Sequence, residues 1–342
     1  MNTWKGTICF LSLLTMSACL TPEKVKEHHT YKELKNDKNK RINALRKEIN
    51  TQNKRIKNLE EANISLSDLL DSLENNDNQR IAESKVSSSK PSYIGKETEK
   101  YLDANGNQSY RVYVKGKVFT TYLIKHPGDI KLFWKNKNRR ITNLEGLKRM
   151  ASKDSEELIF GMNAGIFTQG GRPEGLFVVA GKEQVPLNTR QGTGNFYLEP
   201  NGVFFITERD SAAVLKTASF AAIQSDLKIK YATQSGPMLV INNKVHPVFK
   251  EDSKHYNIRN GVGVKADGSL VFLISEKPVT LYQFARIFKD HFKCPNALYL
   301  DGAISKAYLP KLDKNRGLTG NFGPLIGVYK NKAQKNSPNK SK

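Results

Sequence analysis

Cysteine is scarce in this sequence, which contains only Cys9, Cys19 and Cys294. Cys9 lies in an N-terminal apolar stretch that we expect to be cleaved off, and we expect Cys19 to carry a lipid. Only Cys294 would then remain in the mature chain, which excludes an intrachain disulfide, a four-cysteine zinc site and a redox pair. Because Cys294 precedes a proline and an apolar run, we predict a buried structural thiol there rather than a nucleophile.

The sequence also lacks an apolar run of roughly 20 residues, the length that a membrane-spanning helix needs. The run at 7–16 is shorter, follows a lysine and precedes small residues. This is the pattern of a secretory signal peptide. Ser17 and Ala18 directly before Cys19 resemble a bacterial lipobox, although Met16 stands where leucine is usual.

We therefore predict a lipoprotein signal peptide at 1–18 and lipidation of Cys19. The alternative is an ordinary signal peptide with an incidental cysteine. Leu20 follows the cysteine, where an aspartate would indicate retention in an inner membrane. The expected location is the cell envelope, with the protein anchored by lipid in the outer membrane and facing the periplasm or the cell surface.

Acidic residues are few, 33 against 55 Lys and Arg, which gives a formal net charge of +22. The lysines are spread along the chain, with a loose cluster near the C-terminus that we expect to form a basic disordered tail at 331–342. No RNP-like or zinc-finger pattern occurs. Because an exported protein seldom meets nucleic acid, we exclude it as a partner and expect anionic lipid, phosphorylated glycan or peptidoglycan.

Patterns of cofactor and metal sites are lacking too. His126, His246, His255 and His291 show no HExxH-like spacing, and no Walker or dinucleotide-binding fingerprint occurs. The segment around Ser235 is not a GxSxG elbow. We predict no cofactor and no metal site, although no pattern rules out a divalent cation.

Proline and glycine are absent from 31–80. With Ile42 at heptad position a, eight of the first ten a and d positions are apolar. Ile at a with Leu at d favours a parallel two-stranded coiled coil, and Asn63 at an a position would fix its register. We predict a coiled-coil stalk at 19–83 that forms a homodimer, the alternative being a solvated single helix. A Ser- and Lys-rich linker follows at 84–92.

From residue 93 the pattern changes to short apolar strands separated by turns, with one clear helix. That helix, at 280–292, has capping-box spacing at Thr280 and Gln283 and an apolar stripe that we assign to the core. The predicted fold is α+β: a mixed, sheet-rich head domain at 93–330 with packed helices, preceded by the coiled-coil helix. The other predicted elements are strands or hairpins within 110–124, 201–206, 236–249, 261–275 and 297–300, and a helix at 144–150.

Four segments of the head domain place glycine and polar side chains beside apolar strands, at 160–178, 233–240, 257–264 and 297–305. Each segment alone has a structural explanation, such as a turn cap, a loop serine, a surface ion or an Asp-Gly turn. Together they point to a site, because binding groups concentrate where strand ends lie on a rigid scaffold. Their polar candidates are Asn163, Arg172, Glu174, Ser235, Arg259, Asp301 and Ser305.

These segments resemble the phosphodiester glycosidases, the family of the uncovering enzyme that removes N-acetylglucosamine from a phosphodiester on lysosomal-enzyme glycans. The likeness is to a bacterial branch of unknown function. Matching stretches run in the family's order between about 161 and 328, and they include MNAGIF, PEGLFV, QSGPMLVIN, IRNGVGV and NALYLDGAIS. The resemblance covers the head domain and says nothing of the stalk.

The resemblance implies a hydrolase with an oxocarbenium-like transition state, which normally uses two carboxyl groups. Asp301 is the predicted catalytic carboxylate, with Glu174 as the second. Arg259 is predicted to bind the phosphate because guanidinium binds it in bidentate geometry, with Arg172 as the second candidate. The remaining predicted substrate-binding residues are Asn163, Ser235, Gly236, Gly302 and Ser305.

One departure from the family pattern is clear: Ala303 and Ile304 stand where the family has glycines. We expect a stiffer loop and a tighter pocket there. The predicted function is exported cleavage of a sugar-1-phosphodiester in envelope or extracellular glycans. The departure motivates an alternative, a non-catalytic glycan-binding or envelope-tethering lipoprotein on the same scaffold.

Overall fold

The computed structural model divides the chain into two units, Met1–Ile64 and Ser65–Lys342. The predicted signal peptide, the lipidation site Cys19, the linker 84–92, Gly302 and Ala303 lie outside the described residues. So do most of the stalk and the tail beyond Asn331. The described residues are 39–40, 42–44, 47–48, 50–51, 93–137, 139–153, 155–301, 304–313 and 318–331.

In the first unit, the described residues are helical, and Thr51 Oγ1 donates to Lys47 O at 2.9 Å, one helical turn earlier. The pairing of two such helices stays a prediction. Among the described residues, no helix is long and apolar enough to cross a membrane.

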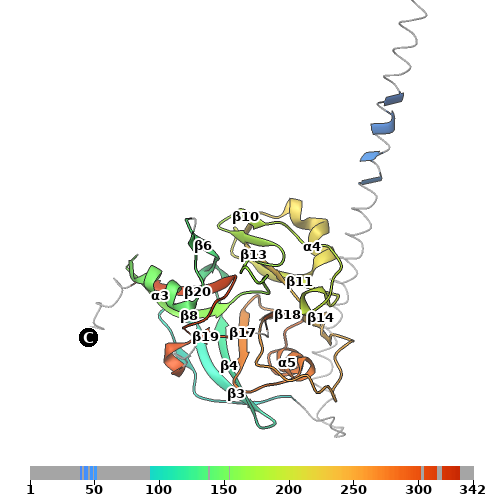
Figure 1. The fold of residues 1–342 in the computed structure, drawn as a ribbon. Coiled ribbons are helices and arrows are strands. Elements are labelled where there is room, and N and C mark those ends of the chain that lie inside the picture. Colours follow the sequence, from blue (N-terminus) through green and yellow to red (C-terminus); the bar gives the residue numbers. More distant parts are fainter. Residues whose placement is uncertain are drawn as a thin grey trace, which may run out of the picture. The chain divides into compact units, whose positions relative to one another are not determined.

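The second unit contains three sheets and a short two-stranded ribbon among its described residues (Figure 1). The nine-stranded sheet has the order β1-β3-β4-β17-β16-β18-β14-β15, with β2 paired to β3, and its pairs are antiparallel. Its strands are β1 (Lys96–Glu97), β2 (Tyr101–Leu102), β3 (Gln108–Val114), β4 (Lys117–Ile124), β14 (Met238–Ile241), β15 (Lys244–Val245), β16 (Asn260–Val264), β17 (Leu270–Ser275) and β18 (Asn296–Asp301).

The other two sheets are smaller and also antiparallel. The five-stranded sheet contains, in spatial order, β10 (Lys182–Val185), β9 (Phe177–Val179), β13 (Ile229–Ser235), β11 (Gly202–Thr207) and β12 (Ala212–Lys216). The four-stranded sheet contains β19 (Ala307–Tyr308), β8 (Glu156–Asn163), β20 (Leu325–Asn331) and β5 (Ile130–Phe133). The ribbon pairs β6 (Lys135–Asn136) with β7 (Arg139–Arg140).

The central strands of the nine-stranded sheet are buried on both faces, which explains why most of their residues are apolar. In β18, Leu298 and Leu300 belong to the core cluster shared with the other two sheets. Ala297 and Tyr299 belong to the cluster under the helix α5. Because successive side chains of a strand point to opposite faces, burial of both faces favours an apolar run over alternation of apolar and polar residues.

Few helices cover these sheets, so the predicted α+β class is confirmed. The predicted capping box at the start of α5 is present: Gln283 N donates to Thr280 Oγ1 at 3.1 Å, and Thr280 N donates to Gln283 Oε1 at 3.1 Å. Cys294 is buried beside this helix, as predicted, and burial raises the pKa of its thiol. The helices are α3 (Leu144–Lys153), α4 (Thr217–Ile223), α5 (Leu281–Arg286) and a π-helical turn at Ile287–His291, with 3-10 turns at Pro127–Asp129, Asn195–Tyr197, Gln224–Asp226 and Pro310–Leu312.

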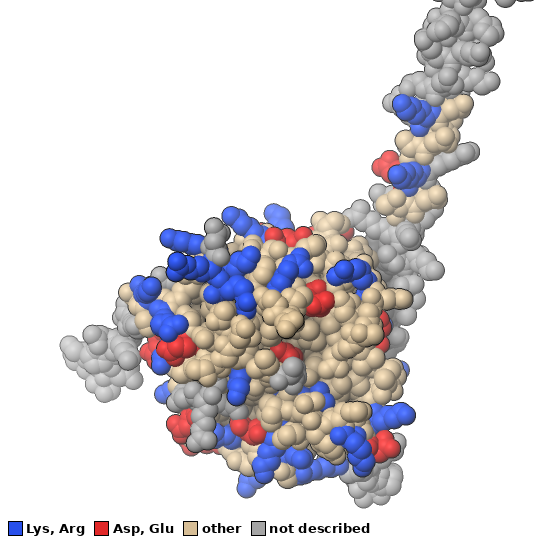
Figure 2. Space-filling model, viewed as in Figure 1, with Lys and Arg blue, Asp and Glu red and all other residues tan. Residues whose placement is uncertain are grey.

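The surface reflects the basic composition. Figure 2 shows Lys and Arg side chains scattered over the visible face of the second unit, with fewer Asp and Glu side chains among them. Such a surface raises the local concentration of anions around the molecule.

Candidate active site

Three strand ends, one from each sheet, meet at one place in the second unit. Asn163 is the last residue of β8, Ser235 of β13 and Asp301 of β18. Asn163 Nδ2 donates to Asp301 Oδ2 at 3.2 Å, and Ser235 Oγ donates to Leu300 O at 2.8 Å. The structure therefore brings together three residues that the sequence predicted to share a site.

The carboxylate of Asp301 is placed by an irregularity in the pairing of β16 with β18. Asn260 pairs with Asp301, but Gly261 pairs with Tyr299, so Leu300 is the extra residue of a bulge. A bulge bends its strand and redirects the side chains around it. Asp301 is 5% exposed. The strand therefore holds its carboxylate in a fixed position, and the residue is not part of an exposed turn.

Asn260 is the connecting residue of this site, and sequence reasoning missed it. Its Oδ1 accepts from Asp301 N at 3.0 Å and from Ser305 Oγ at 3.2 Å. Its Nδ2 donates to Asn163 O at 2.9 Å and lies 3.2 Å from Asn163 Oδ1. One buried amide thus links β16, β8, β18 and the segment after β18.

Asn163 and Ser235 are completely buried and bonded to protein groups. Asn163 Oδ1 accepts from Lys306 N at 2.9 Å, and Ser235 Oγ accepts from Ile166 N at 3.3 Å. These contacts hold the site in shape. Binding of substrate by Asn163, Ser235 or Ser305 stays a prediction.

Glu174 lies at the end of a hairpin that starts at Ile166, where Glu174 N donates to Ile166 O at 3.0 Å. Its carboxylate Oε1 accepts from the hydroxyl of Tyr197 at 2.6 Å. Ile166 N also donates to Ser235 Oγ, so a hydrogen bond connects this hairpin to the end of β13. Glu174 is half-buried.

Gln234, directly before Ser235, holds the Glu174 segment in place. Its buried Oε1 accepts from Leu176 N at 3.0 Å and from Asn188 N at 2.9 Å, and its Nε2 donates to Asn188 O at 2.7 Å. Asn188 Nδ2 in turn donates to Glu174 O at 2.9 Å. Sequence reasoning missed Gln234, Asn188 and Tyr197, although Gln234 directly precedes Ser235, which the sequence singled out.

Gly236 is a position where the backbone must pass close to a neighbour. A Cβ atom there would lie 2.7 Å from Asn201 Cβ and 2.7 Å from Phe196 O. A close approach of Gly236 to a ligand stays a prediction. The close contact with 195–201 explains why a residue without a side chain stands at this position.

Arg259 is 2% exposed, and its guanidinium donates to protein oxygens through all three nitrogens. The acceptors are Val279 O at 2.8 Å, Tyr299 Oη at 3.1 Å and His255 O at 2.9 Å. Burial lowers the pKa of Arg259, and burial raises the pKa of Tyr299 to about 12 although the guanidinium opposes this shift. Phosphate binding by Arg259 stays a prediction, and in this arrangement the side chain ties the start of β16 to β18.

Arg172 is exposed near the tip of the hairpin that ends at Glu174. Side chains from outside the hairpin hold the backbone of its tip. Trp134 Nε1 donates to Gly171 O at 2.9 Å, and Arg140 Nη1 donates to Gly170 O at 2.7 Å. The hairpin therefore presents Arg172 from an anchored backbone.

Within the described ranges, no group of three or more His, Cys, Asp or Glu side chains has an arrangement that could hold a metal ion. The chemically active groups brought together here are a carboxylate, amides and hydroxyls. Such a set can hold sugar hydroxyls and stabilise a developing positive charge.

Comparison with known proteins gives one family. The family model described as phosphodiester glycosidase matches residues 156–329, the stretch that contains every predicted site residue of the head domain. The uncharacterized protein YigE of Escherichia coli K12 is 32% identical over 180 residues, which cover 53% of this chain and 69% of YigE.

Solved structures are more distant. The zebrafish N-acetylglucosamine-1-phosphodiester alpha-N-acetylglucosaminidase catalytic domain, auto-inhibited by its pro-peptide, is 14% identical, with a TM-score of 0.45 over 72% of this chain and 86% of that chain. A hypothetical protein from Synechocystis is 13% identical, with a TM-score of 0.42 over 65% of this chain and 61% of that chain. The match of the family model over half of the sequence and the identity to YigE show that this chain belongs to the phosphodiester glycosidase family.

Proposed function

We propose that the protein is a hydrolase that cleaves the bond between the anomeric carbon of a sugar and the oxygen of a phosphodiester. The observation that carries this proposal is the buried Asp301 carboxylate, oriented by the Asn163 amide at 3.2 Å inside the part of the chain that matches a glycosidase family. A glycosidase needs a carboxylate in a fixed place beside the anomeric carbon.

Asp301 would stabilise the positive charge that develops on the sugar ring or activate the attacking water. The leaving group is a phosphate ester, which is already stable as an anion, so it needs little protonation. Fixed dipoles and charges aimed at developing charge are the largest single contribution in many enzymes. The asparagine amides around Asp301 supply that rigidity.

Glu174 would act as the second carboxyl group. Its Oε1 accepts from Tyr197 at 2.6 Å, which leaves the other carboxylate oxygen available for a water or a sugar hydroxyl. The hydrogen bonds of Gln234 and Asn188 with the segment 174–176 hold the backbone around Glu174 in place.

The leaving phosphate would be bound by a cation that solvent can reach. Arg172 fits this role better than Arg259, because Arg172 is exposed on the anchored hairpin while Arg259 is buried with its nitrogens engaged. Guanidinium is suited to this task because it can bind two phosphate oxygens at once.

The substrate proposal rests on the expected location. A signal peptide at 1–18, a lipid on Cys19 and a dimeric coiled coil at 19–83 would hold the enzyme at the cell envelope, near phosphorylated glycans. The net charge of +22 favours such anionic substrates.

The test is turnover of the purified full chain on a panel of sugar-1-phosphodiesters, including nucleotide sugars, with release of reducing sugar as readout. Release that is lost in Asp301→Asn and kept in Asp252→Asn, an exposed aspartate, would support the proposal. A cooperatively folded protein that binds one of these sugars without releasing it would overturn the proposal and favour the tethering lipoprotein.

A further inference from the structure

A cavity of about 490 Å³ lies in the second unit away from Asp301. β16 begins at Asn260, which pairs with Asp301, and ends at Val264. The turn that follows, Lys265–Ser269, lines the cavity. Since a strand rises about 3.3 Å per residue, the cavity and the candidate active site are separated by at least roughly 13 Å along β16.

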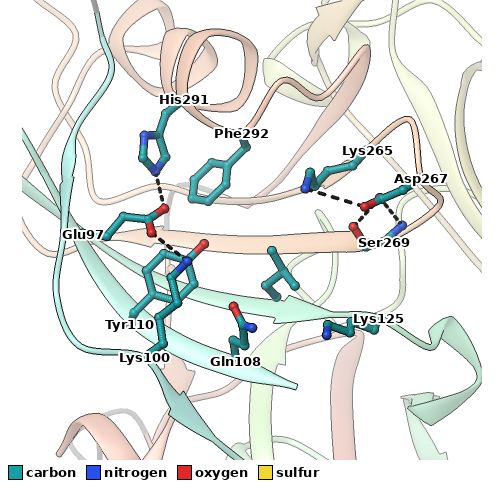
Figure 3. A pocket seen from close by; sticks show the side chains of 11 residues that line it. Glu97, Lys100, Gln108, Tyr110, Lys125, Lys265, Asp267, Ser269, His291 and Phe292 are labelled. Atoms are coloured by element: carbon teal, nitrogen blue, oxygen red, sulfur yellow. Dashed lines mark hydrogen bonds and ion pairs between the residues drawn. The ribbon is translucent and has the colours of Figure 1, made fainter. Parts of the chain in front are cut away.

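Most side chains that line the cavity are polar or charged, and three of them are lysines. Figure 3 shows the ring of Phe292 and the amide of Gln108 near its middle, with Lys100 on one side and Lys125 and Lys265 on the other. A volume of this size is within the range of small-molecule sites.

The charges around the cavity are unequal. Glu97 is engaged by Lys100 at 2.9 Å and by His291 Nε2 at 3.0 Å. Asp267 faces Lys265 at the longer distance of 3.8 Å and also accepts from Ser269 Oγ at 2.5 Å. Because three lysines face two carboxylates, the lining keeps one positive charge in excess.

Two polar side chains of the lining have donors to spare. The ammonium of Lys125 forms no ion pair with the residues that the structure describes, and neither does the amide of Gln108 form a hydrogen bond with them. Lysine ammonium groups bind phosphate as point charges, and a primary amide both donates to and accepts from hydroxyl groups. The open donors and the cationic excess suit a ligand that combines a phosphate with hydroxyl groups.

We propose that this cavity is a second binding site, for a phosphorylated saccharide, with the phosphate at Lys125 and Lys265 and the sugar hydroxyls at Gln108. The site is separate from Asp301, so its binding does not require the proposed hydrolase activity. A glycan with repeated phosphates could occupy both places, and the cavity would then hold the polymer while the active site cleaves it.

The direct test is acylation footprinting of lysines in the purified full chain, read by mass spectrometry, with glucose 1-phosphate as the probe. Bound probe should lower the reactivity of Lys125 and Lys265 by a factor of about 1 + [L]/Kd, which is about fourfold at three times Kd. Lys182, an exposed residue of β10, is the matched control and should keep its reactivity. Unchanged reactivity of Lys125 at every probe concentration would overturn the proposal.

Two further probes separate sugar recognition from simple anion binding. Glucose should protect neither lysine, and inorganic phosphate should protect them less than glucose 1-phosphate does. Equal protection by inorganic phosphate would overturn the saccharide part of the proposal.

The variant Gln108→Leu should raise the Kd for glucose 1-phosphate and leave the Kd for phosphate unchanged, and an unchanged Kd for both would contradict the placement of the sugar. Footprinting of Asp301→Asn should give the same protection as the wild type. The absence of hydrolysis and the absence of binding in the cavity are therefore separate results, and each one tests a different proposal.

Discussion

Asp301 is held by side chains that lie far from it in the sequence. Its carboxylate bonds to an amide 138 positions away, and its backbone N–H bonds to an amide 41 positions away. These hydrogen bonds keep the carboxylate from rotating freely. Its orientation is therefore fixed before any substrate arrives, which is what electrostatic stabilisation of a transition state requires.

The variant Asn260→Ala tests this support. It leaves Asp301 N and Asn163 O without their buried partner, so the free energy of unfolding should fall by about 1–3 kcal/mol. Misplacement of Asp301 should lower turnover about a hundredfold. Thermal melting and turnover are the measurements, with Asn136→Ala, on the exposed ribbon, as the control. Wild-type turnover in Asn260→Ala would show that Asp301 does not depend on this amide.

The variant Tyr197→Phe tests whether Glu174 needs its hydroxyl partner. Loss of the 2.6 Å hydrogen bond should lower kcat/KM about tenfold, the equivalent of about 1.4 kcal/mol, with little change in Tm. Steady-state kinetics is the measurement, and Tyr256→Phe, at an exposed tyrosine, is the control. Equal kcat/KM in the two variants would show that Glu174 does not depend on this hydrogen bond.

Sequence reasoning found the segments of the site but did not find every residue that connects them. In NIRNGVGV it chose Arg259 for its charge, whereas Asn260 makes the contacts with Asn163 and Asp301. Adjacent residues of an extended chain point to opposite sides. Which side faces the site depends on the pairing of β16 with β18, and no local pattern encodes that pairing.

At the level of the elements, the junction of β13 and β14 is closely packed against a neighbouring turn. Gly236 lies between Ser235 and the first residues of β14, against the backbone of Phe196. This contact packs the Asn195–Tyr197 turn, which carries Tyr197, onto the strand end of β13.

The variant Gly236→Ala should therefore destabilise the protein. Its Cβ would lie 2.7 Å from a backbone oxygen that cannot move alone, and overpacking of this kind costs about 1–3 kcal/mol. Gly170→Ala is the matched control, because the nearest atom there lies 3.9 Å from the added Cβ. Urea denaturation of both variants is the measurement, and equal midpoints would contradict the close contact.

Turns and helix caps that depend on a few adjacent residues were predictable from the sequence. The assignment of strands to sheets was not. The capping box at Thr280 and Gln283, the Lys115–Gly116 turn between β3 and β4, and the hairpin around Asp267 each follow from a few adjacent residues. The division of strands among three sheets depends on pairs such as β8 with β20, which are distant in the chain. The convergence of Asn163, Ser235 and Asp301 was inferred from polar residues at strand ends and from the family resemblance rather than from periodicity.

At the scale of the whole molecule, a buried histidine makes stability depend on pH. His246 is 1% exposed, its Nε2 lies 3.1 Å from Glu199 O, and its Nδ1 accepts from Val248 N at 3.3 Å. Burial lowers the pKa of His246, and the backbone hydrogen bond opposes this shift only in part. The unfolded chain therefore binds this proton at higher pH than the folded protein does.

Stability should be level above the ordinary histidine pKa of about 6.5 and should fall below it, by at most about 1.4 kcal/mol per pH unit for this group. Melting temperatures between pH 7.5 and pH 5 are the measurement. His246→Gln should show a shallower acid decline than the wild type, while His291, whose pKa is also lowered by burial, keeps part of it. An identical decline in His246→Gln would rule out His246 as the cause.

The central claim is that a phosphodiester is cleaved on its sugar side. Hydrolysis in water labelled with oxygen-18 tests this most directly, because attack on the anomeric carbon puts the label on the sugar and leaves the phosphate ester unlabelled. Mass spectrometry of the released phosphate ester is the readout, since phosphate oxygens do not exchange quickly with water near neutral pH. Cleavage on the sugar side should give an unlabelled phosphate ester, whereas a labelled ester would show cleavage at phosphorus and rule out the proposed reaction.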